Sequence, residues 1–197
     1  MNLSFDPVDH VYRLDGAVIP SVTQLLSELY GGAFDRIPEA ILDRKRDIGR
    51  AVHSAAELLD AEVLDDSTVD ESCVGYLDAY REFLRIEQPE WVLSEVPMAH
   101  PLHRYAGTPD RIGLLRGDQC VVDFKTCVQL HAAIGVQTAA YDLLRQQEFS
   151  TPMPAKRYAL QLKPNGTYKL VPYQNADDYR VFLSLIGLYN WKRKHEH

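Results

Sequence analysis

The stretch YAGTPDRIGLLRGDQCVVDFKT, residues 105–126, decides how this sequence folds. Two apolar runs flank a turn signal at residues 116–118, so the segment predicts two antiparallel strands joined by a tight hairpin. Charged residues interrupt those runs, because Asp110 follows a proline while Asp123 and Lys125 lie in a β-rich segment. A charge inside a buried strand needs a partner or a metal ion, since its desolvation is costly.

The hairpin predicts that the two aspartates meet. Asp110 and Asp123 are 13 positions apart, and a turn at residues 116–118 brings them to the same end of neighbouring strands. Two such carboxylates repel each other unless a cation lies between them, and their oxygens suit the hard ions Mg²⁺ and Mn²⁺. Lys125, two positions after Asp123, emerges on the same strand face. The pattern is typical of metal-assisted phosphodiester hydrolysis, in which carboxylates hold a metal ion beside a water molecule and a cation.

The rest of the chain predicts helices alternating with hairpins. Alternation around Asp15-Gly16 indicates an N-terminal β-hairpin that leads into a short helix, and Asn165-Gly166 indicates a later hairpin. Pro38 suits the first turn of a longer helix, and residues 69–86, 132–147 and 177–194 have helical patterns, whereas residues 91–98 favour a strand. We therefore expect an α/β fold, with a central mixed β-sheet flanked by helices and an N-terminal β-hairpin, in one domain spanning residues 1–197.

Composition excludes several classes of protein. The formal net charge is −7, which argues against binding nucleic acid by general electrostatics alone. Apolar runs fall short of the ~18 residues that span a bilayer, and the N-terminus lacks the features of a signal peptide, so we expect a cytoplasmic protein with no membrane partner. The cysteines, Cys73, Cys120 and Cys127, form no CxxC pair, which disfavours zinc and iron–sulfur sites.

Four motifs within residues 49–141 resemble a known family. The segments GTPDRIG and VVDFKT resemble the PD-(D/E)xK nuclease superfamily, and GRAVHSAAE and QTAAY resemble its RecB and lambda-exonuclease branch. The resemblance implies a restriction-endonuclease-like core. It also implies that Mg²⁺ or Mn²⁺ is held by His53, Asp110, Asp123 and the backbone carbonyl of Phe124. Asp110, Asp123 and Lys125 are then the catalytic residues, with Lys125 orienting the attacking water.

Further residues are expected to support this site. Glu57 lies four positions after His53 on one helix face, where it could hold the second ring nitrogen or reach a second metal ion through water. Glu95 precedes Asp110 in the expected strand at residues 91–98. The resemblance assigns Gln137 and Tyr141, at i and i+4 of one helix, to supporting the site and touching nucleic acid. A plainer interpretation remains for each residue. Glu57 could be a solvated acid on a helix, Glu95 a charge on an edge strand, and Gln137 with Tyr141 simple helix surface.

Candidate contacts to nucleic acid are scattered along the chain. Basic residues could follow the phosphates, and tyrosines could stack on an unpaired base, although solvated surface and ordinary packing explain the same residues. The candidates are Arg44, Lys45, Arg46, Arg50, Arg104, Lys163, Tyr105 and Tyr141.

The expected function is a metal-dependent DNA exonuclease that hydrolyses linear DNA from its ends. It would act on DNA in recombination, repair or phage DNA processing, with a separate recombination or single-strand-binding protein as a candidate partner. Relatives with an iron–sulfur cluster need four cysteines, and the chain has three, so no such cluster is expected. The alternatives are an endonuclease of the same fold, of restriction or junction-resolving type, and a non-catalytic nucleic-acid-binding module with a structural metal. An enzyme acting on a small phosphate ester is disfavoured by the lack of a glycine-rich phosphate loop.

Overall fold

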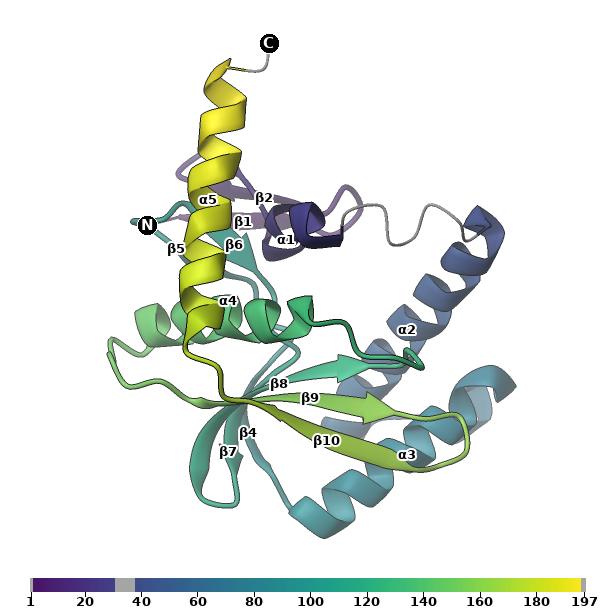
Figure 1. Ribbon diagram of the computed structural model, residues 1–197. Coiled ribbons are helices and arrows are strands. Elements are labelled where there is room, and N and C mark those ends of the chain that lie inside the picture. Colours follow the sequence, from purple (N-terminus) through teal and green to yellow (C-terminus); the bar gives the residue numbers. More distant parts are fainter. Residues whose placement is uncertain (1, 31–37, 196–197) are drawn as a thin grey trace.

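A five-stranded mixed β-sheet forms the centre of the molecule (Figure 1). The computed structural model describes residues 2–30 and 38–195. The sheet has the order β10-β9-β8-β7-β4, and only β8 and β9 run parallel, the other neighbours being antiparallel. Their bounds are β4, Glu90–Ser94; β7, Arg111–Leu115; β8, Asp118–Lys125; β9, Lys156–Leu162; and β10, Tyr168–Tyr173. A parallel pair needs a crossover connection, which α4 (Ala133–Glu148) supplies. The expected central mixed sheet is confirmed.

Helices cover both faces of this sheet. On one face α4 packs with α1 (Val22–Tyr30) and α5 (Asp177–His195); on the other lie α2 (Glu39–Asp60) and α3 (Glu71–Glu87). A short 3₁₀ turn, Asp66–Thr68, connects α2 to α3. Side chains of β8 alternate between the two layers, since Val121 packs with α4 while Val122 and Phe124 pack with α2 and α3. This alternation leaves Asp123 and Lys125 on the α4 face.

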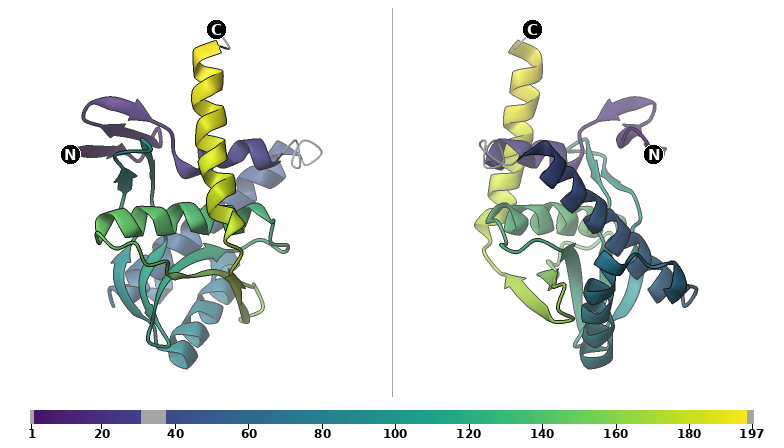
Figure 2. Two further views of the ribbon diagram at one scale, coloured as in Figure 1. Left: turned by 60° about the vertical axis from the view of Figure 1, so that its left-hand side comes forward. Right: turned by 90° about the vertical axis from the view of Figure 1, so that its right-hand side faces the viewer.

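Two small sheets lie beside the central one. Strands β1 (Leu3–Asp6), β2 (Val11–Leu14) and β3 (Ala17–Ile19) form an antiparallel meander, so the expected N-terminal hairpin is confirmed with one further strand. Strands β5 (Met98–His100) and β6 (Tyr105–Gly107) form the second pair. Figure 2 shows the meander on one side of α5, whose last turns extend beyond the rest of the molecule. Tyr12, Leu14, Ile19, Ala99 and Ala106 form the core between these sheets.

The hairpin of β7 and β8 has the predicted turn. Leu115 pairs with Asp118, so residues 116 and 117 form a two-residue loop, and both have positive φ, 55° and 81°. A primed turn of this kind matches the twist of the flanking strands. At the open end Arg111 pairs with Val122, which puts Asp110 and Asp123 at corresponding positions one residue further on.

The expected single strand at residues 91–98 is wrong. The chain there forms two strands, because β4 ends at Ser94 and pairs with β7, whereas β5 begins at Met98 and pairs with β6. The break follows from Glu95, whose φ of 50° is left-handed and cannot continue a strand. The backbone N–H of Glu95 donates to the carbonyl oxygen of Asp110 at 3.2 Å, so the kink is held against the chain that carries the first aspartate.

Helices of the described residues lack the length and apolar character needed to cross a membrane.

Candidate active site

The two aspartates lie buried at the open end of the β7–β8 hairpin. Asp110 Oδ2 accepts a hydrogen bond from the backbone N–H of Phe124 at 2.5 Å, which ties the residue before β7 to the end of β8. Asp123 lies on the α4 face of β8, and both carboxylates are nearly inaccessible to solvent. The local reason is the two-residue turn, which sets the register that pairs these positions.

Three side chains form a group that could hold a metal ion. His53 comes from α2, and its Nδ1 lies 3.3 Å from Glu95 Oε1 and 3.4 Å from Asp110 Oδ1. The ligand atoms of His53, Glu95 and Asp110 all lie within 4.8 Å of one another. The sequence placed Glu95 only in a supporting role, and the structure brings it directly to His53. The kink at Glu95 explains the difference, since a continuous strand would not turn this side chain toward the histidine.

The charges of this group depend on one another. Burial lowers the pKa of His53, but the carboxylates of Asp110 and Glu95 outweigh burial and raise it to about 10. Burial raises the pKa of Asp110, yet His53 holds it below its ordinary value, whereas the pKa of Glu95 stays raised by burial. A positive charge is therefore strongly favoured between these carboxylates, and a divalent cation would meet the same need as the imidazolium proton.

Lys125 lies against the second aspartate. Its Nζ is 2.5 Å from Asp123 Oδ2. Burial raises the pKa of Asp123 to about 6 against the opposing effect of Lys125, while Asp123 and Asp110 raise the pKa of Lys125 despite burial. Asp123 Oδ2 is a buried oxygen whose partner among the described residues is the ammonium of Lys125. A carboxylate oxygen has two lone pairs, so it can accept a metal ion as well as the ammonium.

The donors present fit a hard divalent cation. They are the imidazole nitrogen of His53, the carboxylates of Glu95 and Asp110, and the carboxylate of Asp123 beside Lys125, which suit Mg²⁺ or Mn²⁺ better than a thiophilic metal. The ring of Phe124 packs against His53 with centroids 5.7 Å apart, so this residue adjoins the group. The part of its carbonyl oxygen as a ligand stays a prediction.

The other supporting residues differ in placement. Gln137 Nε2 donates to Tyr141 Oη at 3.1 Å, and both side chains are buried on α4. Burial, and then Asp123 and Asp110, raise the pKa of Tyr141, which puts its hydroxyl within the field of the acids. Glu57 is exposed, and the described residues that contact the His53 ring nitrogen Nδ1 are Glu95 and Asp110.

Sequence reasoning missed a buried arginine behind the site. Arg111 is fully buried; its Nε donates to Asp60 Oδ2 at 2.7 Å and its Nη1 to the carbonyl oxygen of Asp110 at 2.6 Å. Its guanidinium also lies 4.9 Å from the centre of the Phe124 ring and 3.7 Å from Glu95 Oε1. An arginine in a strand is ordinarily exposed, so nothing in the local sequence identifies it.

The basic residues predicted on α2 are exposed and partly paired. Arg46 forms ion pairs with Glu39 and Asp43, and Arg50 pairs with Asp47. Lys45 and Arg46 line a pocket of 360 Å³ together with Thr126 and Cys127, which directly follow Lys125. Arg44 is exposed on the same helix. Lys163 is half-buried just after β9, whose C-terminal end lies beside that of β8.

Base stacking by Tyr105 is excluded in this structure. Its ring is fully buried against Phe182, with centroids 4.8 Å apart, and its hydroxyl donates to the carbonyl oxygen of Ala140 at 2.9 Å. Tyr141 is nearly as buried and offers no open ring face. The Tyr105 ring is buried because an aromatic residue in a short strand packs into whatever core that strand meets. The neighbouring Arg104 is exposed.

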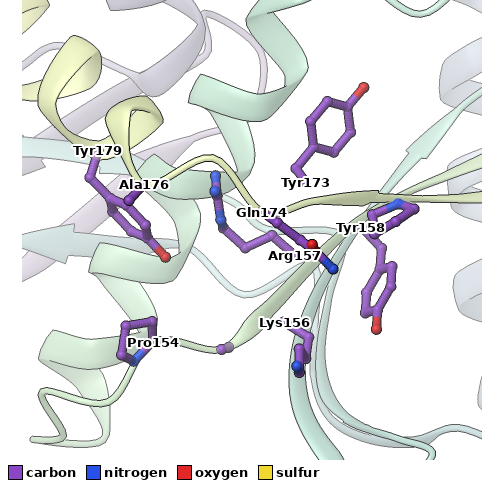
Figure 3. Close-up of a pocket in the computed structure, with 10 residues that line it drawn as sticks. Pro154, Lys156, Arg157, Tyr158, Tyr173, Gln174, Ala176 and Tyr179 are labelled. Atoms are coloured by element: carbon purple, nitrogen blue, oxygen red, sulfur yellow. The ribbon is translucent and has the colours of Figure 1, made fainter.

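A further pocket, of 470 Å³, lies at the opposite end of β9 (Figure 3). Arg157 approaches it, but its guanidinium already donates to the carbonyl oxygens of Gly135 and Asn175, at 2.7 and 2.8 Å, and pairs with Asp178. The guanidinium of Arg157 thus joins α4 to the start of α5. Its role in this pocket is structural.

Fold and site together define an α/β protein in which carboxylates and one lysine at a strand end of the mixed sheet lie beside one histidine from α2. The fold is similar to the crystal structure of a provisionally named exonuclease from Eubacterium rectale, with a TM-score of 0.54 and 13% sequence identity over 89% of this chain and 79% of that chain. At that identity the likeness shows the fold alone.

Two other solved structures align more weakly. SSO0001 gives a TM-score of 0.38 at 17% identity, covering 87% of this chain and 90% of that one. LHK-Exo, solved in complex with dAMP, gives 0.32 at 10% identity, covering 89% and 92%. No protein-family model matches the sequence, and no curated protein does.

Proposed function

We propose that this protein is a metal-dependent deoxyribonuclease that hydrolyses linear DNA from its ends. One observation carries the proposal: the buried Asp110 and Asp123 converge at one strand end, with Lys125 beside the second. Carboxylates held together at this cost suit a divalent metal, and the adjacent ammonium suits a reaction that develops negative charge. The likeness in fold to a provisionally named exonuclease supports the choice of nuclease.

The residues divide the chemistry between them. His53, Glu95 and Asp110 would hold the metal ion, with Asp123 and the Phe124 carbonyl as further ligands. A bound Mg²⁺ or Mn²⁺ polarises the phosphate and makes a nearby water more acidic. Lys125 keeps its proton, because neighbouring carboxylates raise its pKa, so its ammonium can orient the attacking water and stabilise charge on the phosphate. Arg111 fixes the backbone of Asp110 from behind.

The biological setting is part of the same proposal. A nuclease domain of this kind suits recombination, repair or phage DNA processing in the cytoplasm, alongside a separate recombination or single-strand-binding protein. The PD-(D/E)xK motifs quoted from residues 49–141 support this branch assignment.

The test is cleavage of end-labelled linear DNA, single- and double-stranded, beside covalently closed circles, with Mg²⁺ or Mn²⁺. Loss of linear DNA alone, abolished by EDTA and by Asp123→Asn, is the expected result. Cutting of closed circles would instead make the enzyme an endonuclease. Intact DNA in all lanes, together with calorimetric binding of Mn²⁺, would favour the non-catalytic binding module.

A further inference from the structure

A third pocket is lined by basic side chains and lies apart from the acidic site. It measures 410 Å³ and lies between β3, the turn joining β5 to β6, and the last turns of α5. Figures 1 and 2 show these elements above α4, on the side of the molecule away from α3. Residues 18–20 and Leu102 form its apolar wall. Its polar lining consists of His103, Arg104, Asn190, Arg193 and Lys194.

The three strong bases of this pocket have no carboxylate partner among the described residues. Within residues 2–30 and 38–195, Arg104, Arg193 and Lys194 form no ion pair, and no acid lines the pocket. Among the other described bases, Arg46, Arg50, Arg81, Arg85, Arg116 and Arg180 have carboxylate partners, whereas Arg13, Arg44, Lys45, Lys156, Lys163 and Lys169 form no ion pair; what sets this pocket apart is that three unpaired bases line it together. In a chain of net charge −7, this is a local excess of positive charge.

Helix electrostatics explain only part of the cluster. Cations in the last turn of α5 complement the negative end of its dipole, which accounts for Arg193 and Lys194. Arg104 comes from a different element, and a tight turn holds it there: its φ is 52° and its N–H donates to the carbonyl oxygen of His100 at 2.8 Å. Two elements distant in sequence therefore supply like charges to one pocket, and like charges that converge call for an anion.

The chain length bounds how far this pocket lies from the acids. Arg104 precedes Asp110 by six positions, so their Cα atoms are at most ~20 Å apart. At about 3.4 Å per nucleotide along one DNA strand, that distance spans roughly six phosphates. A DNA strand whose end is held at Asp110 and Asp123 therefore reaches the pocket within about six nucleotides.

We propose that this pocket binds the phosphodiester backbone of the DNA substrate several nucleotides from the bond being cut, an inference that rests on the proposed function. Guanidinium groups bind phosphate oxygens in a bidentate manner, and the ammonium adds a point charge. The pocket then compensates for the acidic surface of the chain, and it matters only for substrates long enough to reach it.

The test compares two triple variants of equal charge. The pocket variant is Arg104→Gln, Arg193→Gln, Lys194→Gln; the control, Arg85→Gln, Arg180→Gln, Lys156→Gln, removes three exposed cations elsewhere. Fluorescence anisotropy with labelled linear DNA in EDTA gives the affinity without cleavage. The pocket variant should bind at least about tenfold more weakly than the control, with its salt slope reduced by about two to three. Circular dichroism melting should match for the two.

Three outcomes would overturn the inference. Equal DNA affinity of the two variants would remove the pocket from the binding track. An equal loss of turnover on dinucleotides and on long DNA in the pocket variant would point to a disturbed active site, since a contact several nucleotides from the cleaved bond should affect long substrates alone. Calorimetric binding of inorganic phosphate with unchanged DNA affinity would assign the pocket to a free anion. Because binding is measured in EDTA, a protein that binds DNA through the pocket but cleaves none would refute the proposed function and leave only DNA binding by the pocket supported.

Discussion

The Oδ2 oxygen of Asp110 accepts its hydrogen bond from the backbone N–H of Phe124, one residue after Asp123. This side chain thus continues the β7–β8 ladder beyond its last backbone pair, Arg111 with Val122. The other carboxylate oxygen, Oδ1, faces His53 at 3.4 Å. One carboxylate therefore both holds the end of the hairpin together and presents an oxygen to the group that could hold a metal.

Removing the lysine should separate catalysis from binding. Lys125→Ala should lower DNA hydrolysis by about 10²–10³-fold, because it deletes the cation beside the reacting phosphate, and leave DNA affinity within about twofold. Single-turnover cleavage and anisotropy measure the two effects. Lys156→Ala, an exposed lysine at the far end of β9, is the control and should retain full turnover. A Lys125→Ala protein as active as that control would exclude the proposed role.

The two glutamates near His53 should differ in their effect on metal affinity. Glu95→Gln should weaken Mn²⁺ binding by about tenfold or more, since Glu95 contacts the histidine and Asp110 lies within the same group. Glu57→Gln changes an exposed carboxylate on the same helix as His53 and should leave Mn²⁺ affinity unchanged. Isothermal titration calorimetry measures both. The reverse ranking would restore the sequence-based expectation for Glu57.

The buried arginine should be essential for stability. Arg111→Met leaves the Asp60 carboxylate without its 2.7 Å donor and the carbonyl of Asp110 without its 2.6 Å donor, so we expect a loss of about 3–5 kcal/mol in the free energy of unfolding. Urea denaturation measures it. Arg85→Met, which removes an exposed i,i+3 pair with Glu82, should cost less than about 1 kcal/mol. Comparable losses in the two variants would show that Arg111 contributes no more than a surface ion pair.

Substituting alanine for two helical glycines should change the stability of the protein in opposite directions. A Cβ at Gly75 would collide with the carbonyl oxygen of Pro164, so Gly75→Ala should push α3 away from the β9–β10 turn and cost about 1–3 kcal/mol. Nothing lies within 4 Å of a Cβ at Gly187, in α5, so Gly187→Ala should gain up to about 1 kcal/mol of helix propensity. Thermal melting of both variants tests the packing of α3 against the turn, and equal shifts would contradict it.

Stability should depend on pH through Glu87. Arg116 donates to both its carboxylate oxygens, at 2.7 and 2.6 Å, and these bonds lower the pKa of Glu87. A depressed folded-state pKa stabilises the protein above the ordinary glutamate pKa of about 4.3, and the contribution is lost as pH falls through the folded value. Because Arg116 is largely exposed, the effect should be about 1 kcal/mol or less.

The measurement is urea denaturation of the unaltered protein and Glu87→Gln at pH 7 and near pH 3. The stability difference between them should be largest at pH 7 and shrink in acid. Glu90→Gln, an exposed glutamate on β4, should show no such convergence. A difference that grows in acid would mean the opposite sign of the shift.

Much of the candidate site was predictable because it is local. The hairpin at residues 105–126 contains its own turn and alternation, so it sets which residues of β7 and β8 correspond, and Asp123 and Lys125 share a face by strand period alone. The helix that carries His53 and the one that carries Gln137 and Tyr141 were likewise readable from their periodicity. These features depend on neighbours within a few residues.

Long-range contacts decided what sequence reasoning missed. Glu95 reaches His53 because its left-handed backbone lets β5 leave the central sheet for β6, and a glutamate gives no local sign of that conformation. Arg111 is buried because Asp60, 51 residues earlier in the chain, meets it from α2. Tyr105 is unavailable for stacking because α5 supplies Phe182 against its ring.

The sequence by itself therefore determined the mixed α/β fold and the convergence of Asp110 and Asp123 with Lys125, since strand period and turn chemistry act between near neighbours. Tertiary structure alone decided which further carboxylate joins His53, which aromatic rings are buried, and which cations meet around Arg104. Those outcomes depend on burial and charge between elements far apart in the chain, and no local pattern encodes that proximity.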